Sequence, residues 1–162
     1  IAVKSVTLSL KKTTLGVKEK FTLKATVKPS NATNRKVKWT TSKSSVATVN
    51  SKGVVTAKKK GTAKITATAD GKKAACTITV KAAPSKVSLN ARKATVKRGK
   101  TYQIKAKLPK NTASYKMTYS TSNKKVATVS SSAKVKGLKK GTAVITVKTF
   151  NGKKAKIKIT VK

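Results

Sequence analysis

The chain has 162 residues, of which 41 are Lys or Arg and only two are acidic, so its formal net charge is +39. It contains no His, and Glu19 and Asp70 are its only carboxylate side chains. Most general acid–base schemes and most metal sites depend on these residue types. We therefore expect no catalytic site, no cofactor and no metal, and no apolar run approaches the ~18 residues of a membrane helix.

Apolar and polar residues alternate along most of the first half of the chain, which is typical of half-buried β-strands. This spacing places Trp39, Ile65 and Cys76 on inward positions, and Asp70-Gly71 predicts a tight hairpin turn. About seven short strands separated by turn residues predict a β-sandwich rather than a helical domain. The expected strands are 6–10, 21–28, 36–40, 46–49, 53–57, 62–69 and 75–80.

The second half of the chain repeats the first. Residues 39–71 return, with substitutions, as 119–152, and Val6 corresponds to Val87. We therefore predict two domains, 1–81 and 87–162, joined by a short linker at 82–86 that contains Pro84. The second domain carries Ala133 where the first has a glycine, so we expect that turn to be remodelled. The predicted core anchors of the two domains are Trp39, Ile65, Cys76, Tyr119 and Ile145.

Several of these segments together resemble one known domain family. They are VTLS at 6–9, WTTS at 39–42, SVATV at 45–49, GVVTA at 53–57, KKGTAKITATADG at 59–71 and CTITV at 76–80. The combination is similar to the bacterial immunoglobulin-like group 2 family, and the resemblance covers the chain twice. It implies an all-β fold of two tandem Ig-like sandwiches. It also implies a stalk, spacer or adhesion role in surface, secreted or phage structural proteins.

Lysine fills both the outward strand positions and the turns. Lysine is a strongly hydrated point charge, whereas Arg usually provides the shaped contacts of specific recognition, and the chain has only three Arg. The lysines therefore predict diffuse attraction to anionic polymers, although a charge run can also be only a solvated face. The candidate polyanion-binding residues in the turns are Lys58, Lys59, Lys60, Lys72, Lys73, Lys124, Lys125, Lys139, Lys140, Lys153 and Lys154.

Three functions remain open from the sequence. The first is a non-enzymatic structural or adhesion module of a bacterial cell-surface (cell-wall) or secreted protein, attracted to teichoic acid or to acidic or sulfated glycans. The second is non-specific nucleic-acid binding, which the charge alone would support. The third is an accessory domain of a secreted carbohydrate-active enzyme. Because the chain begins without Met, we expect neighbouring domains in a longer protein.

Two further expectations concern single residues. Glu19 and Asp70 are expected to be solvated turn residues, because neither falls on an inward strand position. Trp39 and Tyr119 are expected to be core anchors rather than platforms for sugars or bases.

Overall fold

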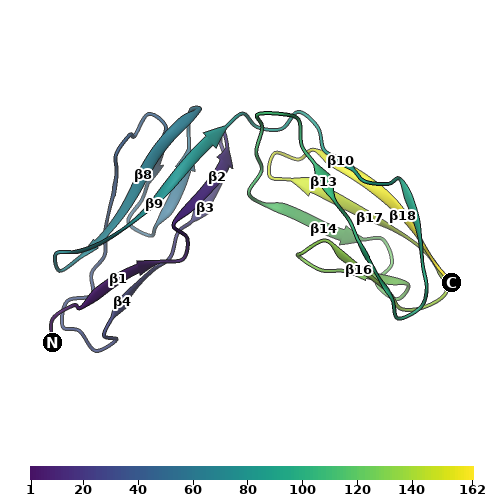
Figure 1. Ribbon diagram of the computed structural model, residues 1–162, viewed down its shortest axis with the longest axis horizontal. Coiled ribbons are helices and arrows are strands. Elements are labelled where there is room, and N and C mark those ends of the chain that lie inside the picture. The colour runs from purple at the N-terminus through teal and green to yellow at the C-terminus, as the bar shows by residue number, and fades with distance from the viewer. The chain divides into compact units, whose positions relative to one another are not determined.

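The computed structural model describes residues 1–162 and is built from 18 strands with no helix. The all-β prediction is therefore confirmed (Figure 1). The chain forms two compact units. Unit 1 comprises Ile1–Ala83 and Asn111–Tyr115, and unit 2 comprises Pro84–Lys110 and Lys116–Lys162. No helix that could cross a membrane is present.

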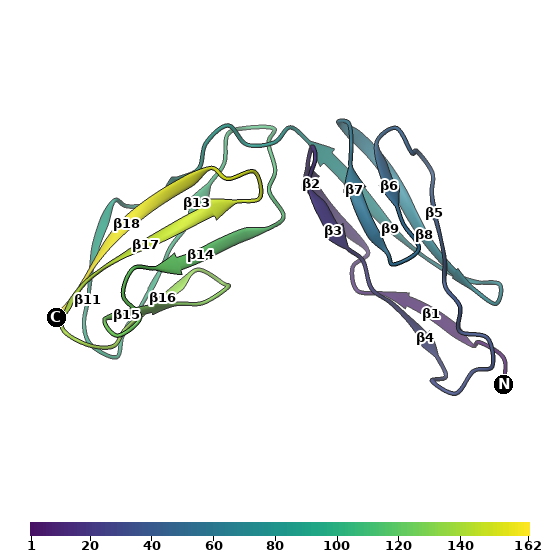
Figure 2. The same cartoon turned by 180° about the vertical axis from the view of Figure 1, so that it is seen from behind.

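Unit 1 is a sandwich of a four-stranded sheet and a three-stranded sheet, extended by a two-stranded ribbon. The orders are β2-β9-β8-β5, β3-β7-β6 and β1-β4, and among these strands only β2 and β9 pair in parallel (Figure 2). Its strands are β1 (Ser5–Leu8), β2 (Lys12–Gly16), β3 (Lys20–Thr22), β4 (Ala25–Lys28), β5 (Lys38–Thr41), β6 (Ala47–Val49), β7 (Val54–Ala57), β8 (Gly61–Ala69) and β9 (Lys72–Lys81).

Unit 2 has the same topology, which can be followed from the opposite side in Figure 2. Its orders are β11-β18-β17-β14, β12-β16-β15 and β10-β13, and the β11–β18 pair is parallel, as its counterpart is in unit 1. Its strands are β10 (Ser88–Leu89), β11 (Lys93–Val96), β12 (Thr101–Gln103), β13 (Ala106–Lys107), β14 (Met117–Thr121), β15 (Ala127–Val129), β16 (Lys134–Gly137), β17 (Gly141–Thr149) and β18 (Lys154–Val161).

Each unit has its own hydrophobic core between its sheets. In unit 1 the largest buried side chains include Leu15, Leu23 and Ile65, and in unit 2 they include Ile145 and Ile157. The inward positions of β8 and β9 and of β17 and β18 are the most completely covered, because these central strands are paired on both edges. The alternation along the strands therefore determines which face of each sheet packs into the core.

The structure differs from the sequence prediction at the strands that change sheets. The expected strand 21–28 divides into β3, which pairs with β7, and β4, which pairs with β1. Apolar and polar residues alternate without interruption through Leu23, so the sequence pattern does not indicate where β3 ends and β4 begins. The parallel strand β2 was not expected either, because KTTLG contains only one large apolar residue, Leu15.

The expected remodelling of the turn at Ala133 is wrong. Ala133 has φ +63°, close to the +78° of Gly53 in unit 1. Both residues also make the same backbone hydrogen bonds. Gly53 N–H donates to the Asn50 carbonyl and Ala133 N–H to the Ser130 carbonyl, each at 3.0 Å. The Gly53 carbonyl accepts from Leu23 N–H and the Ala133 carbonyl from Ile104 N–H. The turn keeps its shape, although Ala133, which has a Cβ, must adopt the left-handed backbone conformation.

Candidate functional site

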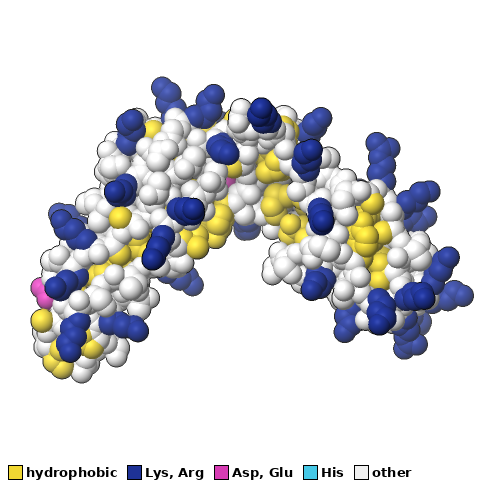
Figure 3. Space-filling model, viewed as in Figure 1, with side chains coloured by type: hydrophobic (Ala, Val, Ile, Leu, Met, Phe, Trp, Pro, Cys, Tyr) yellow, Lys and Arg dark blue, Asp and Glu magenta, His cyan; other side chains and the backbone are white.

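The positive charge lies wholly on the surface of the chain. All 41 Lys and Arg residues are exposed, and Figure 3 shows them spread over the visible face rather than collected in one patch. Among the turn lysines predicted from sequence, Lys58–Lys60 precede β8 and Lys72–Lys73 follow it. The structure therefore does not bring these two clusters together. In unit 2, the pair 139–140 precedes β17 and the pair 153–154 follows it, so they are separated in the same way, and 124–125 precede β15.

Lysines do gather on the outer face of the four-stranded sheet of unit 2. Lys93 on β11 lies directly opposite Lys158 on β18, and Lys148 on β17 lies directly opposite Lys154. Lys156 lies between Lys154 and Lys158 on the same face of β18. We call these five residues the sheet-face lysines. Like charges directly opposite one another on a sheet are destabilising, so this arrangement opposes folding rather than supports it.

The equivalent face of unit 1 avoids such pairs. Lys12 on β2 is opposite Thr77, and Lys73 on β9 is opposite Thr68. Only Lys154 of the sheet-face lysines was a sequence candidate. The two-residue period also places Lys156 and Lys158 on outward positions, whereas the pairing of Lys158 with Lys93 depends on the parallel register of β11.

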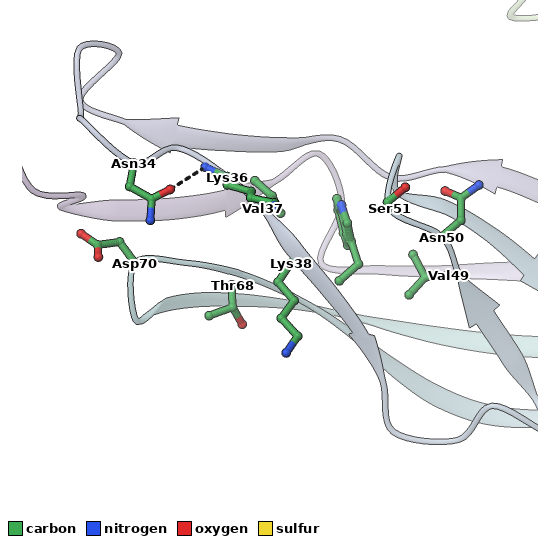
Figure 4. Close-up of a pocket in the computed structure, with 10 residues that line it drawn as sticks. Asn34, Lys36, Val37, Lys38, Val49, Asn50, Ser51, Thr68 and Asp70 are labelled. Atoms are coloured by element: carbon green, nitrogen blue, oxygen red, sulfur yellow. Dashed lines mark hydrogen bonds between the residues drawn. The ribbon is translucent and has the colours of Figure 1, made fainter.

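A second feature is a shallow groove of about 550 Å³ in unit 1 beside Trp39, which we call the Trp39 groove. It runs along β5, the edge strand of the four-stranded sheet. Asn34 and Asp70 lie together at one end, and Asn50 and Ser51 lie at the other (Figure 4). The remaining lining residues are Lys36, Val37, Lys38, Val49 and Thr68.

Trp39 is half-buried and packs against the core clusters of unit 1. Its indole lies so close to Gly53 that a Cβ at that position would be 2.9 Å from Cζ2. The indole Nε1 makes no hydrogen bond within the protein, and no buried side-chain nitrogen lacks a partner. The Nε1–H group is therefore accessible to solvent, where it is free to donate a hydrogen bond.

Two groove residues are held by the backbone. Asn50 Oδ1 accepts hydrogen bonds from the N–H groups of Lys52, at 3.0 Å, and Val54, at 2.9 Å. These bonds fix the amide and leave its Nδ2 donors unused. Asp70 has φ +47° at the β8–β9 turn, and its carboxylate accepts a long bond of 3.4 Å from Val3 N–H.

Tyr119 occupies the position of Trp39 in unit 2 and is also half-buried against the core. Burial raises the pKa of its phenol. The hollow beside it is smaller, about 320 Å³, and its lining includes no Asn, Asp or Trp. The two units therefore differ in this feature although their folds agree.

The expectation that Glu19 is solvated is wrong. Glu19 is only 1% exposed. Its Oε2 accepts hydrogen bonds from Gly16 N–H and Tyr115 N–H, both at 2.9 Å, within unit 1. The ring of Tyr115 also meets Phe21 edge to face, with 4.6 Å between the ring centroids. The carboxylate therefore holds backbone donors in place. No sequence pattern predicts this burial, because both hydrogen-bond partners depend on loop conformation.

The other predicted core anchors lie between the sheets. Ile65, Ile145 and Cys76 are fully buried, and burial raises the pKa of the Cys76 thiol. This environment keeps the thiol protonated and poorly nucleophilic. The structure holds no cluster of three or more His, Cys, Asp or Glu residues that could bind a metal ion.

Comparison with known proteins places this geometry in context. The chain is 52% identical over 83 residues to an Ig-like virion protein of Serratia phage KSP90, covering 49% of this chain and 32% of the relative. It is 56% identical over 66 residues to a kappa-carrageenase of Pseudoalteromonas carrageenovora, covering 41% of this chain and 17% of the relative. The chain thus spans a third or less of the length of these relatives.

Among solved structures, domains 5 and 6 of the surface-layer protein SbsC align with 99% of this chain and 98% of their own. The identity is 15% and the TM-score 0.45. A model of one domain family matches residues 2–80 and again residues 84–161. With the two sandwiches of identical topology, this match shows that the chain belongs to the bacterial Ig-like domain (group 2) family, of which it carries two consecutive copies.

Proposed function

We propose that the two domains form a non-enzymatic structural module of a longer bacterial surface or secreted protein, attracted through its lysines to anionic polymers. The relatives are several times longer than the matched region, which supports a role as one part of a larger chain. The domain boundaries we propose remain 1–81 and 87–162, with 82–86 as linker. The proposed location is extracellular, at the cell surface.

The observation that carries the polyanion hypothesis is the like-charge pairing on unit 2. Lys93 is paired in register with Lys158, and Lys154 with Lys148, so two lysine side chains leave adjacent strands at the same level on one face. Strands lie ~4.8 Å apart, well within the ~8 Å screening length at physiological salt. A polymer with closely spaced sulfate, carboxylate or phosphate groups would relieve this repulsion. Folding alone would favour the Lys–Thr pairs that unit 1 has.

Lysine attraction of this kind is strong, salt-sensitive and poorly selective. Teichoic acid and acidic or sulfated glycans are the partners that suit a surface protein. Duplex DNA is the competing polyanion, and the chain has only three Arg with which to make bidentate contacts.

A competition experiment tests the proposal. Immobilised heparin should retain the chain, and soluble heparin should release it more effectively than duplex DNA does. The comparison is repeated at two salt concentrations. Preference for DNA that survives ~0.3 M salt would overturn the glycan hypothesis, because non-specific phosphate contacts weaken steeply with salt.

Two triple variants test whether the polyanion binds at the sheet-face lysines or at the turn lysines. K148T/K156A/K158T gives unit 2 the residues that unit 1 carries on this face, Thr68, Ala75 and Thr77. K124Q/K125Q/K139Q removes the same number of charges from turns. The sheet-face variant should elute from heparin at lower salt than the turn variant, and equal elution would refute a special role for the sheet face.

A second candidate function is supported by the match to the kappa-carrageenase. In this case the module would be an accessory part of a secreted carbohydrate-active enzyme. Reading the complete gene separates the two. A catalytic domain beside these repeats supports the accessory role, whereas further repeats with a wall anchor support the stalk.

A further inference from the structure

We propose that the Trp39 groove of unit 1 binds a short stretch of an anionic glycan. This inference rests on the proposed function only for the charge of its ligand. The groove itself is a discrete site, formed by residues that were not singled out as a ligand site from the sequence.

The chemistry of the groove suits a sugar chain. Its middle is apolar, formed by Val37, Trp39 and Val49, and its ends are polar. An indole presents an apolar ring face and an N–H donor to a ligand, and a pyranose ring carries C–H groups on its faces and hydroxyls around its edge. A volume of about 550 Å³ lies within the range of small-molecule sites.

The polar ends offer both donors and acceptors. At one end Asn50 has unused Nδ2 donors and is already fixed by two backbone hydrogen bonds. At the other, the Asp70 carboxylate offers acceptors to hydroxyl groups. Sugar hydroxyls both donate and accept hydrogen bonds, so they can satisfy both ends. Lys36 and Lys38 also line the groove and favour a ligand with a sulfate or carboxylate group.

Asp70 argues against nucleic acid as the occupant. It is one of only two acids in a chain of net charge +39, and it lies in this groove. A carboxylate repels the phosphates that recur at every nucleotide of a nucleic-acid strand, whereas a glycan can turn an uncharged hydroxyl toward it. Unit 2 supplies an internal contrast, since the hollow at Tyr119 is lined by neither amide nor carboxylate.

The chain contains its own reporter, because Trp39 is its only tryptophan. Ligand in the groove should change the indole emission, whereas ligand on distant lysines should not. The intact chain is titrated with three probes: a heparin-derived disaccharide (sulfated), digalacturonic acid (carboxylated) and cellobiose (neutral). Two variants of equal charge are compared, K36Q/K38Q in the groove and K59Q/K60Q at the far end of β8.

We expect saturable emission changes with one or both anionic probes and weaker binding of cellobiose. The probe that responds identifies sulfate or carboxylate as the anionic group. K36Q/K38Q should weaken binding about tenfold, as expected for the loss of a charge-assisted hydrogen bond, and K59Q/K60Q by less than about twofold.

Three results would overturn the inference: no emission change, equal weakening in both variants, or equally tight binding of cellobiose. An emission response to a hexathymidylate but not to the sugars would also overturn it, in favour of nucleic acid. If long heparin chains still retain the protein in any of these cases, only the groove is refuted. Loss of heparin retention would instead refute the proposed function.

Discussion

Gly53 is the residue whose replacement we predict to be most informative about unit 1. It has φ +78°, and a Cβ there would lie 2.4 Å from the carbonyl oxygen of Leu23 and 2.9 Å from Cζ2 of Trp39. Placing Ala in the left-handed region costs about 1–2 kcal/mol. Crowding against a packed neighbour adds about 1–3 kcal/mol. We therefore expect Gly53→Ala to lower the free energy of unfolding of unit 1 by about 2–5 kcal/mol.

Unit 2 indicates how the cost can be reduced, because it combines Ala133 with the smaller ring of Tyr119 at the corresponding positions. The double variant W39Y/G53A imports this pair into unit 1. It removes the ring contact but leaves the left-handed alanine, so it should cost about 1 kcal/mol less than the sum of the two single variants.

The unfolding of unit 1 can be followed in every variant by pulse labelling of Cys76, which is the only cysteine, lies in unit 1 and is fully buried. Labelling is measured across a urea gradient, with circular dichroism as a second probe. A Gly53→Ala variant within about 0.5 kcal/mol of wild type would refute the steric reasoning. If the free-energy changes of the two single variants simply add in the double variant, the idea that the smaller tyrosine ring accommodates an alanine in the turn is refuted.

Three further predictions follow from single residues. Lys158→Thr should stabilise unit 2 by about 0.2–1 kcal/mol at low salt, and the gain should shrink in 1 M salt; an undiminished gain would implicate packing instead of charge. Glu19→Gln keeps the size of the buried side chain and an acceptor oxygen but removes the charge, so it should destabilise unit 1 by about 1–3 kcal/mol in urea unfolding, and wild-type stability would show that the negative charge adds little to the two N–H bonds. Iodoacetamide at pH 8 should modify Cys76 in the native chain at least about 100-fold more slowly than in urea, since burial raises the pKa of the thiol; rapid native labelling would mean that β9 opens readily.

The sequence predicted the central sheets well because their physical signal is local. Strands β8, β9, β17 and β18 are long, alternate at most positions and are joined within each unit by a tight turn, so each residue's side of the sheet follows from its parity. The division of 21–28 into β3 and β4 could not be predicted in the same way. Both pieces continue one alternation, and only their different partner strands separate them.

The candidate sites were harder to predict because they depend on contacts between residues that are far apart in the sequence. Parity correctly places Trp39 toward the core, yet it cannot show that β5 is an edge strand, where an inward ring stays partly open. Glu19 falls outside the alternating segments, so composition suggested a solvated turn. Its burial follows from the approach of Tyr115, which is 96 residues away in the chain.

Comparison of the two units separates what the fold requires from what it permits. The cores agree closely, with Ile65 and Ile145 at corresponding positions and both fully buried. The surfaces differ, because unit 1 carries the Trp39 groove and unit 2 carries the like-charge lysine pairs. Neither surface feature is required by the fold, since the same sandwich forms with and without it. Trp39 itself packs against the core of unit 1, so only the polar lining of the groove and the sheet-face lysines can be altered without disturbing the cores.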